Sequence, residues 1–129
     1  MRLMIVDDRR DVRHLLRAIV EDAPEDVVVA GEADGAYAAL EAIADVDPDV
    51  LVLDAFMPDL NGLEVAPLIL DRRPDQAIVL FTGIVDDEVC KRAEEIGIAV
   101  CLSKEDLEEI PGVALRLATR SSGGSAGPA

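Results

Sequence analysis

Carboxylate side chains follow two apolar runs of the sequence that are typical of buried strands. Asp7 and Asp8 follow residues 2–6, and Asp54 follows residues 50–53. A short apolar run with β-branched members, bounded by charge or proline, indicates a strand buried on both faces of a parallel sheet. Carboxylates held close together repel one another, and a hard cation such as Mg²⁺ removes that repulsion by taking their oxygens as ligands. The sequence therefore predicts a magnesium site at Asp7, Asp8 and Asp54.

Two further apolar runs end on side chains that can bind a phosphoryl group. Thr82 follows residues 77–81, and Lys104 closely follows residues 98–102. A carboxylate can attack phosphorus, in a reaction whose catalysis is mostly positioning and electrostatics. Asp54 is then the candidate nucleophile, with the Lys104 ammonium and the Thr82 hydroxyl as partners of the phosphoryl oxygens. Each side chain alone is explained as a helix cap, a surface lysine or a strand end, so the hypothesis depends on their convergence.

The apolar pattern predicts five strands that alternate with five helices. The strands are expected at residues 2–6, 27–30, 50–53, 77–81 and 98–102, and the helices at about 12–20, 35–45, 63–72, 87–96 and 111–119. Asp34 and Asp86 are expected to cap the second and fourth helices. This alternation predicts an α/β fold of the flavodoxin-like kind, a doubly wound five-stranded parallel sheet of order 2-1-3-4-5. In that order the ends of strands one, three, four and five are neighbours.

Composition narrows the class of protein. A chain of 129 residues suits one domain, expected at residues 1–120, with residues 121–129 as a flexible tail or linker stub. A net charge of −15 argues against direct binding of nucleic acid, which needs clustered Lys and Arg. No apolar stretch approaches the roughly 18 residues that span a bilayer. Cys90 and Cys101 show no metal or disulfide spacing and are expected to be reduced thiols. The prediction is a cytoplasmic protein.

At the level of motifs, the chain resembles the receiver (CheY-like) domains of two-component response regulators over roughly residues 1–119. The residues that carry the resemblance are Ile5-Val6-Asp7-Asp8, Leu53-Asp54, Met57-Pro58, Asn61-Gly62, Thr82-Gly83 and Ser103-Lys104. Together these motifs are highly specific, whereas an aspartate pair alone is not.

The resemblance implies a phosphorylation-activated signalling switch. It implies that Asp54 accepts a phosphoryl group from a histidine kinase or a small phosphodonor, and that Thr82 and Lys104 bind that group. It also implies that the backbone carbonyl of Phe56 joins Asp7, Asp8 and Asp54 as a ligand of Mg²⁺. Such a domain catalyses its own phosphorylation and slow dephosphorylation, but does not turn over an external substrate.

Three positions depart from the commonest receiver pattern. Glu105 follows the lysine where proline is frequent, which resembles NarL/FixJ-type receivers and argues against a cis peptide there. Cys101 stands where the family usually has the switch aromatic, Tyr or Phe. Gly83 stands where alanine is frequent after the threonine. A thiol cannot fill the space that an aromatic ring vacates, so the relay from Thr82 is expected to be weak or replaced.

Arginines line the polar face of the first predicted helix. Arg10, Arg13 and Arg17 are read either as a solvated helix face or as a docking patch for an acidic partner. The resemblance favours docking of a sensor histidine kinase at this helix. It leaves open a homodimer and a helix-turn-helix output domain outside this chain.

Two other functions are compatible with these residues. The first is a receiver-fold module that signals by binding alone, without phosphorylation, which Cys101 and Gly83 motivate. The second is a Mg²⁺-dependent phosphohydrolase with an aspartyl nucleophile. The second needs a general acid beside Asp54, and the following residues Ala55 and Phe56 supply none.

Overall fold

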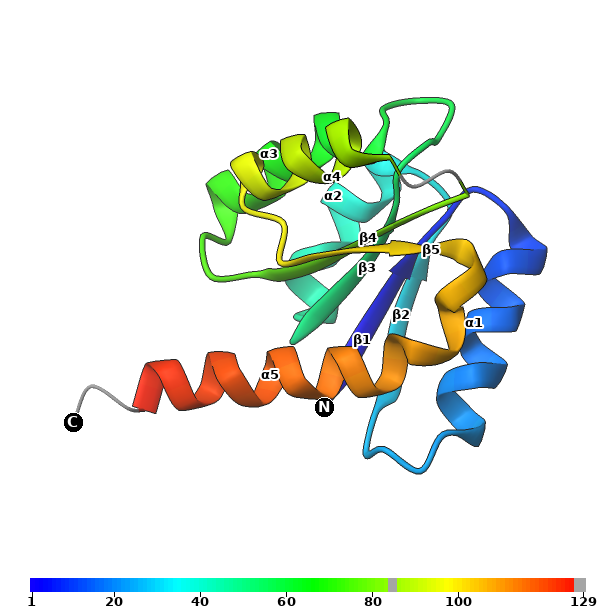
Figure 1. Cartoon of the computed structure of the whole chain (residues 1–129), viewed down its shortest axis with the longest axis vertical. Helices are drawn as coiled ribbons and strands as arrows, with labels where there is room; N and C mark the ends of the chain where they lie inside the picture. The colour runs from blue at the N-terminus through cyan, green and yellow to red at the C-terminus, as the bar shows by residue number, and fades with distance from the viewer. Residues whose placement is uncertain (84–85, 127–129) are drawn as a thin grey trace.

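A single parallel sheet forms the centre of the protein in a computed structural model that describes residues 1–83 and 86–126, with side chains up to Thr119. Its strands lie in the order β2-β1-β3-β4-β5, all pairs being parallel (Figure 1). The strands are β1 (Arg2–Val6), β2 (Val28–Ala33), β3 (Val50–Asp54), β4 (Ala77–Thr82) and β5 (Val100–Ser103). The predicted fold class, strand number and strand order are confirmed.

Helices cover both faces of the sheet (Figure 1). They are α1 (Arg10–Asp22), α2 (Ala36–Val46), α3 (Gly62–Arg72), α4 (Asp87–Ile96) and α5 (Ile110–Ala126), with a 3₁₀ helix η1 (Lys104–Glu109) before α5. Alternate residues of a strand point to opposite faces. Met4 therefore packs in the cluster covered by α2, α3 and α4, whereas its neighbours Leu3 and Ile5 pack in the cluster covered by α1 and α5. This layering makes β3, buried along its whole length, the centre of the domain.

Helix caps and chain ends show where local sequence reasoning was incomplete. Asp86 caps α4 as predicted, by accepting a hydrogen bond from the Val89 N–H. Asp34 does not cap α2, whose first N–H groups donate instead to Asp59. The last helix runs on to Ala126, beyond the predicted end at Thr119 and into the predicted tail. The rest of that tail, residues 127–129, lies outside the described residues.

The second strand was predicted to end at residue 30, but β2 continues through Gly31 to Ala33. The pairing of β1 with β2 shifts register between Leu3 and Met4, where Met4 lies opposite Gly31. A Cβ at Gly31 would come within 2.7 Å of the Val46 side chain at the end of α2. A glycine inside a strand often marks such a close approach rather than a strand end.

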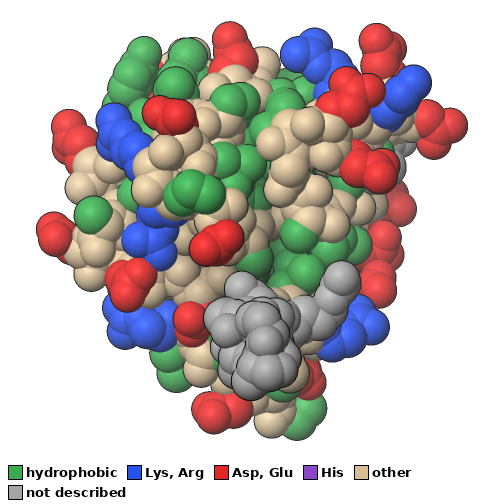
Figure 2. Space-filling model, turned by 90° about the vertical axis from the view of Figure 1, so that its left-hand side faces the viewer, with side chains coloured by type: hydrophobic (Ala, Val, Ile, Leu, Met, Phe, Trp, Pro, Cys, Tyr) green, Lys and Arg blue, Asp and Glu red, His purple; other side chains and the backbone are tan. Residues whose placement is uncertain are grey.

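The surface is acidic overall but not uniformly so. The face seen from the left-hand side of Figure 1 carries apolar side chains between scattered acidic and basic ones (Figure 2). Among the described residues, no helix is long and apolar enough to cross a membrane.

Candidate functional site

Three aspartates meet at the carboxyl edge of the sheet. Asp7 directly follows β1, and Asp54 is the last residue of the neighbouring strand β3. One carboxylate oxygen from each of Asp7, Asp8 and Asp54 lies within 4.8 Å of the other two. The strand order produces this meeting, because the carboxyl ends of neighbouring parallel strands lie at one edge.

Lys104, the residue directly after β5, completes the cluster. Its Nζ lies 3.4 Å from Asp54 Oδ1 and 3.5 Å from Asp7 Oδ2. The same ammonium lies 5.2 Å from the centroid of the Phe81 ring, within cation–π range. The Ser103 hydroxyl accepts a hydrogen bond from the Glu105 N–H and so caps η1, the helix that Lys104 begins. No peptide bond among the described residues is cis, so the bond after Lys104 is trans.

Thr82 lies at the end of β4, opposite Ser103 of β5, and is fully buried. Asp54 lies opposite Phe81 in the adjacent pairing, so Thr82 is one position further along the same edge. The structure thus brings Asp7, Asp8, Asp54 and Lys104 into one cluster and puts Thr82 on the strand between Asp54 and Lys104.

Burial sets the electrostatics of this cluster. Asp7 is 0% exposed and Asp54 is 2% exposed, whereas Asp8 is exposed. Burial and the charge of Asp7 raise the pKa of Asp54 to about 6, against the opposite effects of the Phe56 N–H and Lys104. One ammonium therefore compensates two buried carboxylates only in part.

One carboxylate oxygen in the cluster is left without a hydrogen bond. Asp7 Oδ1 accepts the backbone N–H of Arg9 at 2.7 Å, but buried Asp7 Oδ2 accepts no hydrogen bond from the described residues. Its only charged partner there is Lys104, at the long distance given above. A buried acceptor without a donor is costly. Three clustered carboxylates with an unsatisfied oxygen fit a hard divalent cation such as Mg²⁺, which prefers oxygen ligands.

The loop after Asp54 is held by contacts that sequence reasoning did not find. The Gly62 N–H donates to Ala55 O at 2.7 Å, and a Cβ at Gly62 would lie 2.5 Å from the backbone oxygen of Asp54. Only glycine permits this approach, because any side chain would displace the strand end. Phe56 lies in this loop, with its N–H 3.3 Å from Asp54 Oδ1 and its side chain exposed.

Asp59 ties the same loop to α2. Its carboxylate accepts the Ala36 and Tyr37 N–H groups, each at 3.1 Å, and the Leu60 N–H at 2.9 Å. Burial raises the pKa of Asp59, but these backbone hydrogen bonds outweigh it and hold the pKa below its usual value. No local signal predicts this role, since the capped helix begins 23 residues earlier in the chain.

Arg13 and Arg17 of α1 are engaged within the domain. Arg13 donates to the backbone oxygen of Asp7 at 2.8 Å and pairs with Glu32 of β2 at 3.4 Å. The Arg17 guanidinium pairs with the same Glu32 carboxylate, and Nε donates to it at 2.8 Å. Arg10 is exposed. The predicted arginine patch thus divides into one exposed residue and two that connect α1 to β2, and its role as a docking surface stays a prediction.

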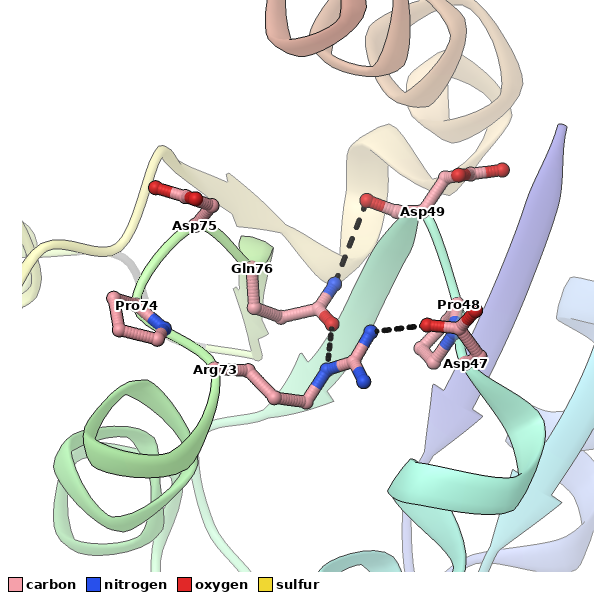
Figure 3. Close-up of a pocket in the computed structure, with 7 residues that line it drawn as sticks. All are labelled: Asp47, Pro48, Asp49, Arg73, Pro74, Asp75 and Gln76. Carbon is pink, nitrogen blue, oxygen red and sulfur yellow. Dashed lines mark hydrogen bonds and ion pairs between the residues drawn. The ribbon is translucent and has the colours of Figure 1, made fainter. Parts of the chain in front are cut away.

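A second polar hollow lies at the opposite, amino edge of the sheet (Figure 3). It is formed by the loop that enters β3 and the loop that enters β4. Arg73 connects the two loops, with Nη2 2.7 Å from Asp47 Oδ1 and Nε donating to Gln76 Oε1 at 2.8 Å. The buried Gln76 amide in turn donates to the backbone oxygens of Asp49 and Ala77. In this hollow each polar group named has a partner.

Comparison with known proteins identifies the domain type. The family model described as the response regulator receiver domain matches residues 3–113. A curated relative, protein-glutamate methylesterase/protein-glutamine glutaminase 1 of Rhizobium johnstonii, is 39% identical over 104 residues, which are 80% of this chain and 30% of that protein. A similar enzyme of Caulobacter vibrioides is 34% identical over 89% of this chain and 33% of its own length. The chain spans about a third of the length of these relatives.

Solved structures agree with this assignment. The signal receiver domain of the putative response regulator NarL from Mycobacterium tuberculosis is 29% identical, with a TM-score of 0.84 over 92% of this chain and 95% of that one. The response regulator domain of Thermotoga maritima CheB, at 24% identity, shares the fold, with a TM-score of 0.80 over 94% of this chain and 95% of that one.

Proposed function

The chain belongs to the response regulator receiver domain family, whose members act as phosphorylation-activated switches in two-component signalling, and we propose that Asp54 is the residue of this chain that accepts the phosphoryl group. The proposal rests on the cluster at the carboxyl edge, where one ammonium neutralises two buried carboxylates only in part. Asp54 is buried beside Asp7, one of whose oxygens accepts no hydrogen bond from the described residues. Such a site costs free energy unless a cation occupies it.

The side chains of Asp7, Asp8 and Asp54, with the backbone carbonyl of Phe56, are the proposed ligands of that cation, Mg²⁺. When bound, Mg²⁺ supplies positive charge beside the phosphoryl oxygens. The cluster of three carboxylates supports this assignment. The exposed Asp8 lies on the solvent side of the cluster, which leaves a route by which a cation can enter.

In the proposed reaction an Asp54 carboxylate oxygen attacks phosphorus. A bond forms between that oxygen and phosphorus, the bond from phosphorus to the donor's nitrogen or oxygen breaks, and its electron pair leaves with the donor. Lys104, already 3.4 Å from Asp54, would then pair with a phosphoryl oxygen, and the Thr82 hydroxyl would donate to another. The pairing of Lys104 with Asp54 would be exchanged for pairing with the phosphoryl group, which supplies a two-state change at β5.

The proposed donor is a sensor histidine kinase, with a small phosphodonor as a substitute. Arg10 is the exposed arginine of α1 available for its docking, because Arg13 and Arg17 are paired with Glu32. We propose residues 1–120 as the receiver domain and a cytoplasmic location. The output activity of a longer protein is not assigned, because the curated relatives are about three times as long as the matched region.

A module that signals by binding alone is the less favoured alternative. Its strongest support is Cys101 in the place of the switch aromatic. Binding alone, however, gives no reason to bury Asp7 and Asp54 side by side with a single ammonium between them.

The test is phosphorylation of the purified chain by a small phosphodonor with Mg²⁺, read by intact mass. The wild type should gain the mass of one phosphoryl group, and removal of Mg²⁺ with a chelator should abolish the gain. Asp54→Asn should gain none. The matched control is Asp49→Asn, which removes an exposed carboxylate at the other end of the same strand and should be phosphorylated normally. An equal gain on Asp54→Asn would overturn the assignment.

A further inference from the structure

Both cysteines of the chain line one cavity between α4 and β5. Cys90 lies in α4 and Cys101 in β5, and both are half-buried. Cys101 packs in the cluster covered by α2, α3 and α4, whereas its strand neighbours Val100 and Leu102 pack in the cluster on the opposite face. The Cys101 side chain is therefore on the α4 side of the sheet.

The two thiols lie close enough for Cys90 to affect the ionisation of Cys101. Burial, a hydrogen bond with Cys90 that the protonated Cys101 thiol donates, and the charges of Cys90 and Asp86 together raise the pKa of the Cys101 thiol to about 12. Cys101 is therefore protonated at neutral pH, and Cys90 lines the same cavity. Sequence spacing gave no sign of this pair, since the residues are on different elements.

The pair joins two weakly held elements. In α4 only Ala93 is buried among the residues of the helix, whereas α3 buries Gly62, Val65, Ala66 and Ile69. β5 is an edge strand whose only strand partner in the described sheet is β4, and all four of its residues are half-buried. A covalent bond between the sulfurs would connect α4, the less buried of these two helices, to the edge strand β5.

We propose that Cys90 and Cys101 form a dithiol site that a hydroperoxide oxidises to an intramolecular disulfide, fixing α4 against β5. The sulfur of Cys90 attacks a peroxide oxygen, the O–O bond breaks, and water or an alcohol leaves. The resulting sulfenic acid is then attacked by Cys101, the S–S bond forms, and water leaves with the second thiol proton. The peroxide receives the two electrons that the dithiol loses.

The consequence for signalling rests on the proposed function, whereas the thiol chemistry does not. Lys104 lies three residues after Cys101, so a disulfide at Cys101 would restrain the strand that presents the phosphate-binding ammonium. Oxidation should then restrict the proposed two-state change at β5, because a cross-linked pair has fewer arrangements available.

The first experiment treats the full chain with hydrogen peroxide, removes the oxidant, alkylates the remaining thiols and measures the intact mass. The wild type should lose two hydrogens, resist alkylation and form no disulfide between chains. Cleavage after Lys91 should leave the two cysteine peptides joined until a reductant is added. Cys90→Ser and Cys101→Ser are matched controls that should lose no hydrogens as monomers. Wild-type protein that keeps both thiols under conditions that fully oxidise free glutathione, or that forms only cross-linked dimers, would overturn the proposal.

The second experiment measures hydrogen exchange of the α4 amides in the reduced and oxidised protein. The disulfide should slow exchange by about tenfold or more, with recovery after reduction and no peroxide effect in Cys101→Ser. Unchanged exchange despite complete disulfide formation would refute the fixing of α4. Asp54→Asn should form the disulfide as readily as the wild type, so failure of the phosphorylation assignment and failure of this one are distinguishable.

Discussion

The two edges of the sheet hold similar charged groups, but these groups are fully paired at one edge and incompletely paired at the other. Each has aspartates that lie beside a cationic side chain. At the amino edge, Arg73 contacts Asp47 at 2.7 Å and donates to Gln76 at 2.8 Å. At the carboxyl edge, Lys104 lies 3.4 Å or more from both buried carboxylates, and Asp7 Oδ2 accepts no hydrogen bond from the described residues.

The pKa shifts follow this difference. Hydrogen bonding to Arg73 lowers the pKa of Asp47, whereas burial raises the pKa of Asp54 to about 6. The amino edge is therefore satisfied by its own side chains and connects two loops. The carboxylates of the carboxyl edge are fully paired only when a further group, such as a cation, binds there. Clustered acidic residues alone do not distinguish a binding site from a structural network, but the unmet hydrogen-bonding capacity does.

Replacing Asp7 by Asn is expected to produce the largest contrast between the edges. It removes the charge of a proposed ligand, so the affinity for Mg²⁺ should fall by about tenfold to a hundredfold. The metal-free protein should become more stable, because the repulsion of Asp54 is relieved. Affinity is measured by NMR titration of the backbone amides with Mg²⁺, and stability by urea denaturation with a chelator present.

The matched control at the amino edge is Asp47→Asn. Asp47 has φ 48°, in the left-handed region that Asn also tolerates, so the backbone should be undisturbed. Its Mg²⁺ affinity should equal that of the wild type. If both variants weakened Mg²⁺ binding to the same extent, the cation would be responding to total charge, and the contrast between the edges would be lost.

Much of the carboxyl edge was predictable because it depends on topology. Short apolar runs locate the strands, alternation with helices makes the sheet parallel, and the strand order then brings Asp7, Asp54 and Lys104 together. The strand order alone was therefore enough to predict that these three side chains lie close together. The roles of Thr82 and Phe56 in binding stay predictions that rest on the family.

What sequence reasoning missed depends on contacts between distant segments. Asp34 stands next to the start of α2, as a cap should, yet Asp59 from another loop takes that role. Arg13 and Arg17 look solvated on a helical wheel, but Glu32 of β2 pairs with both. The pattern of residues on a helix face predicts which way a side chain points, but it does not predict which residue of another element the side chain contacts.

The two edges should also respond to pH in opposite directions. Asp54 has its pKa raised to about 6 from an ordinary 3.8, so the folded protein binds more protons than the unfolded chain between these values. Its contribution to the free energy of unfolding is thus greatest at low pH and is lost as pH rises through about 6. Between pH 5 and 7.5 the metal-free wild type should lose roughly 1 to 1.5 kcal/mol relative to Asp54→Asn.

Mg²⁺ provides the control for this pH effect. Saturating Mg²⁺ should remove the loss at pH 7.5, since a bound cation favours the ionised carboxylate. Asp47 has a lowered pKa, so its contribution is present at neutral pH and is lost as pH falls through its pKa. Urea denaturation at several pH values measures both trends. A wild type that matched Asp54→Asn at every pH would show that Asp54 is not under electrostatic strain.

The smallest effect is expected for Arg73→Ala at the amino edge. Loss of the Arg73 Nε hydrogen bond leaves the buried Gln76 Oε1 without this donor and should cost about 1 kcal/mol in the free energy of unfolding. Phosphorylation of Asp54 should be unaffected, because the whole length of β3 lies between the two sites.

Gln76→Ala is the informative partner variant. In a double-mutant cycle the two losses should be less than additive, since both variants break the same hydrogen bond. Strict additivity would mean that the two side chains act independently. The amino edge would then not be a hydrogen-bonded network, and its contrast with the carboxyl edge would be lost.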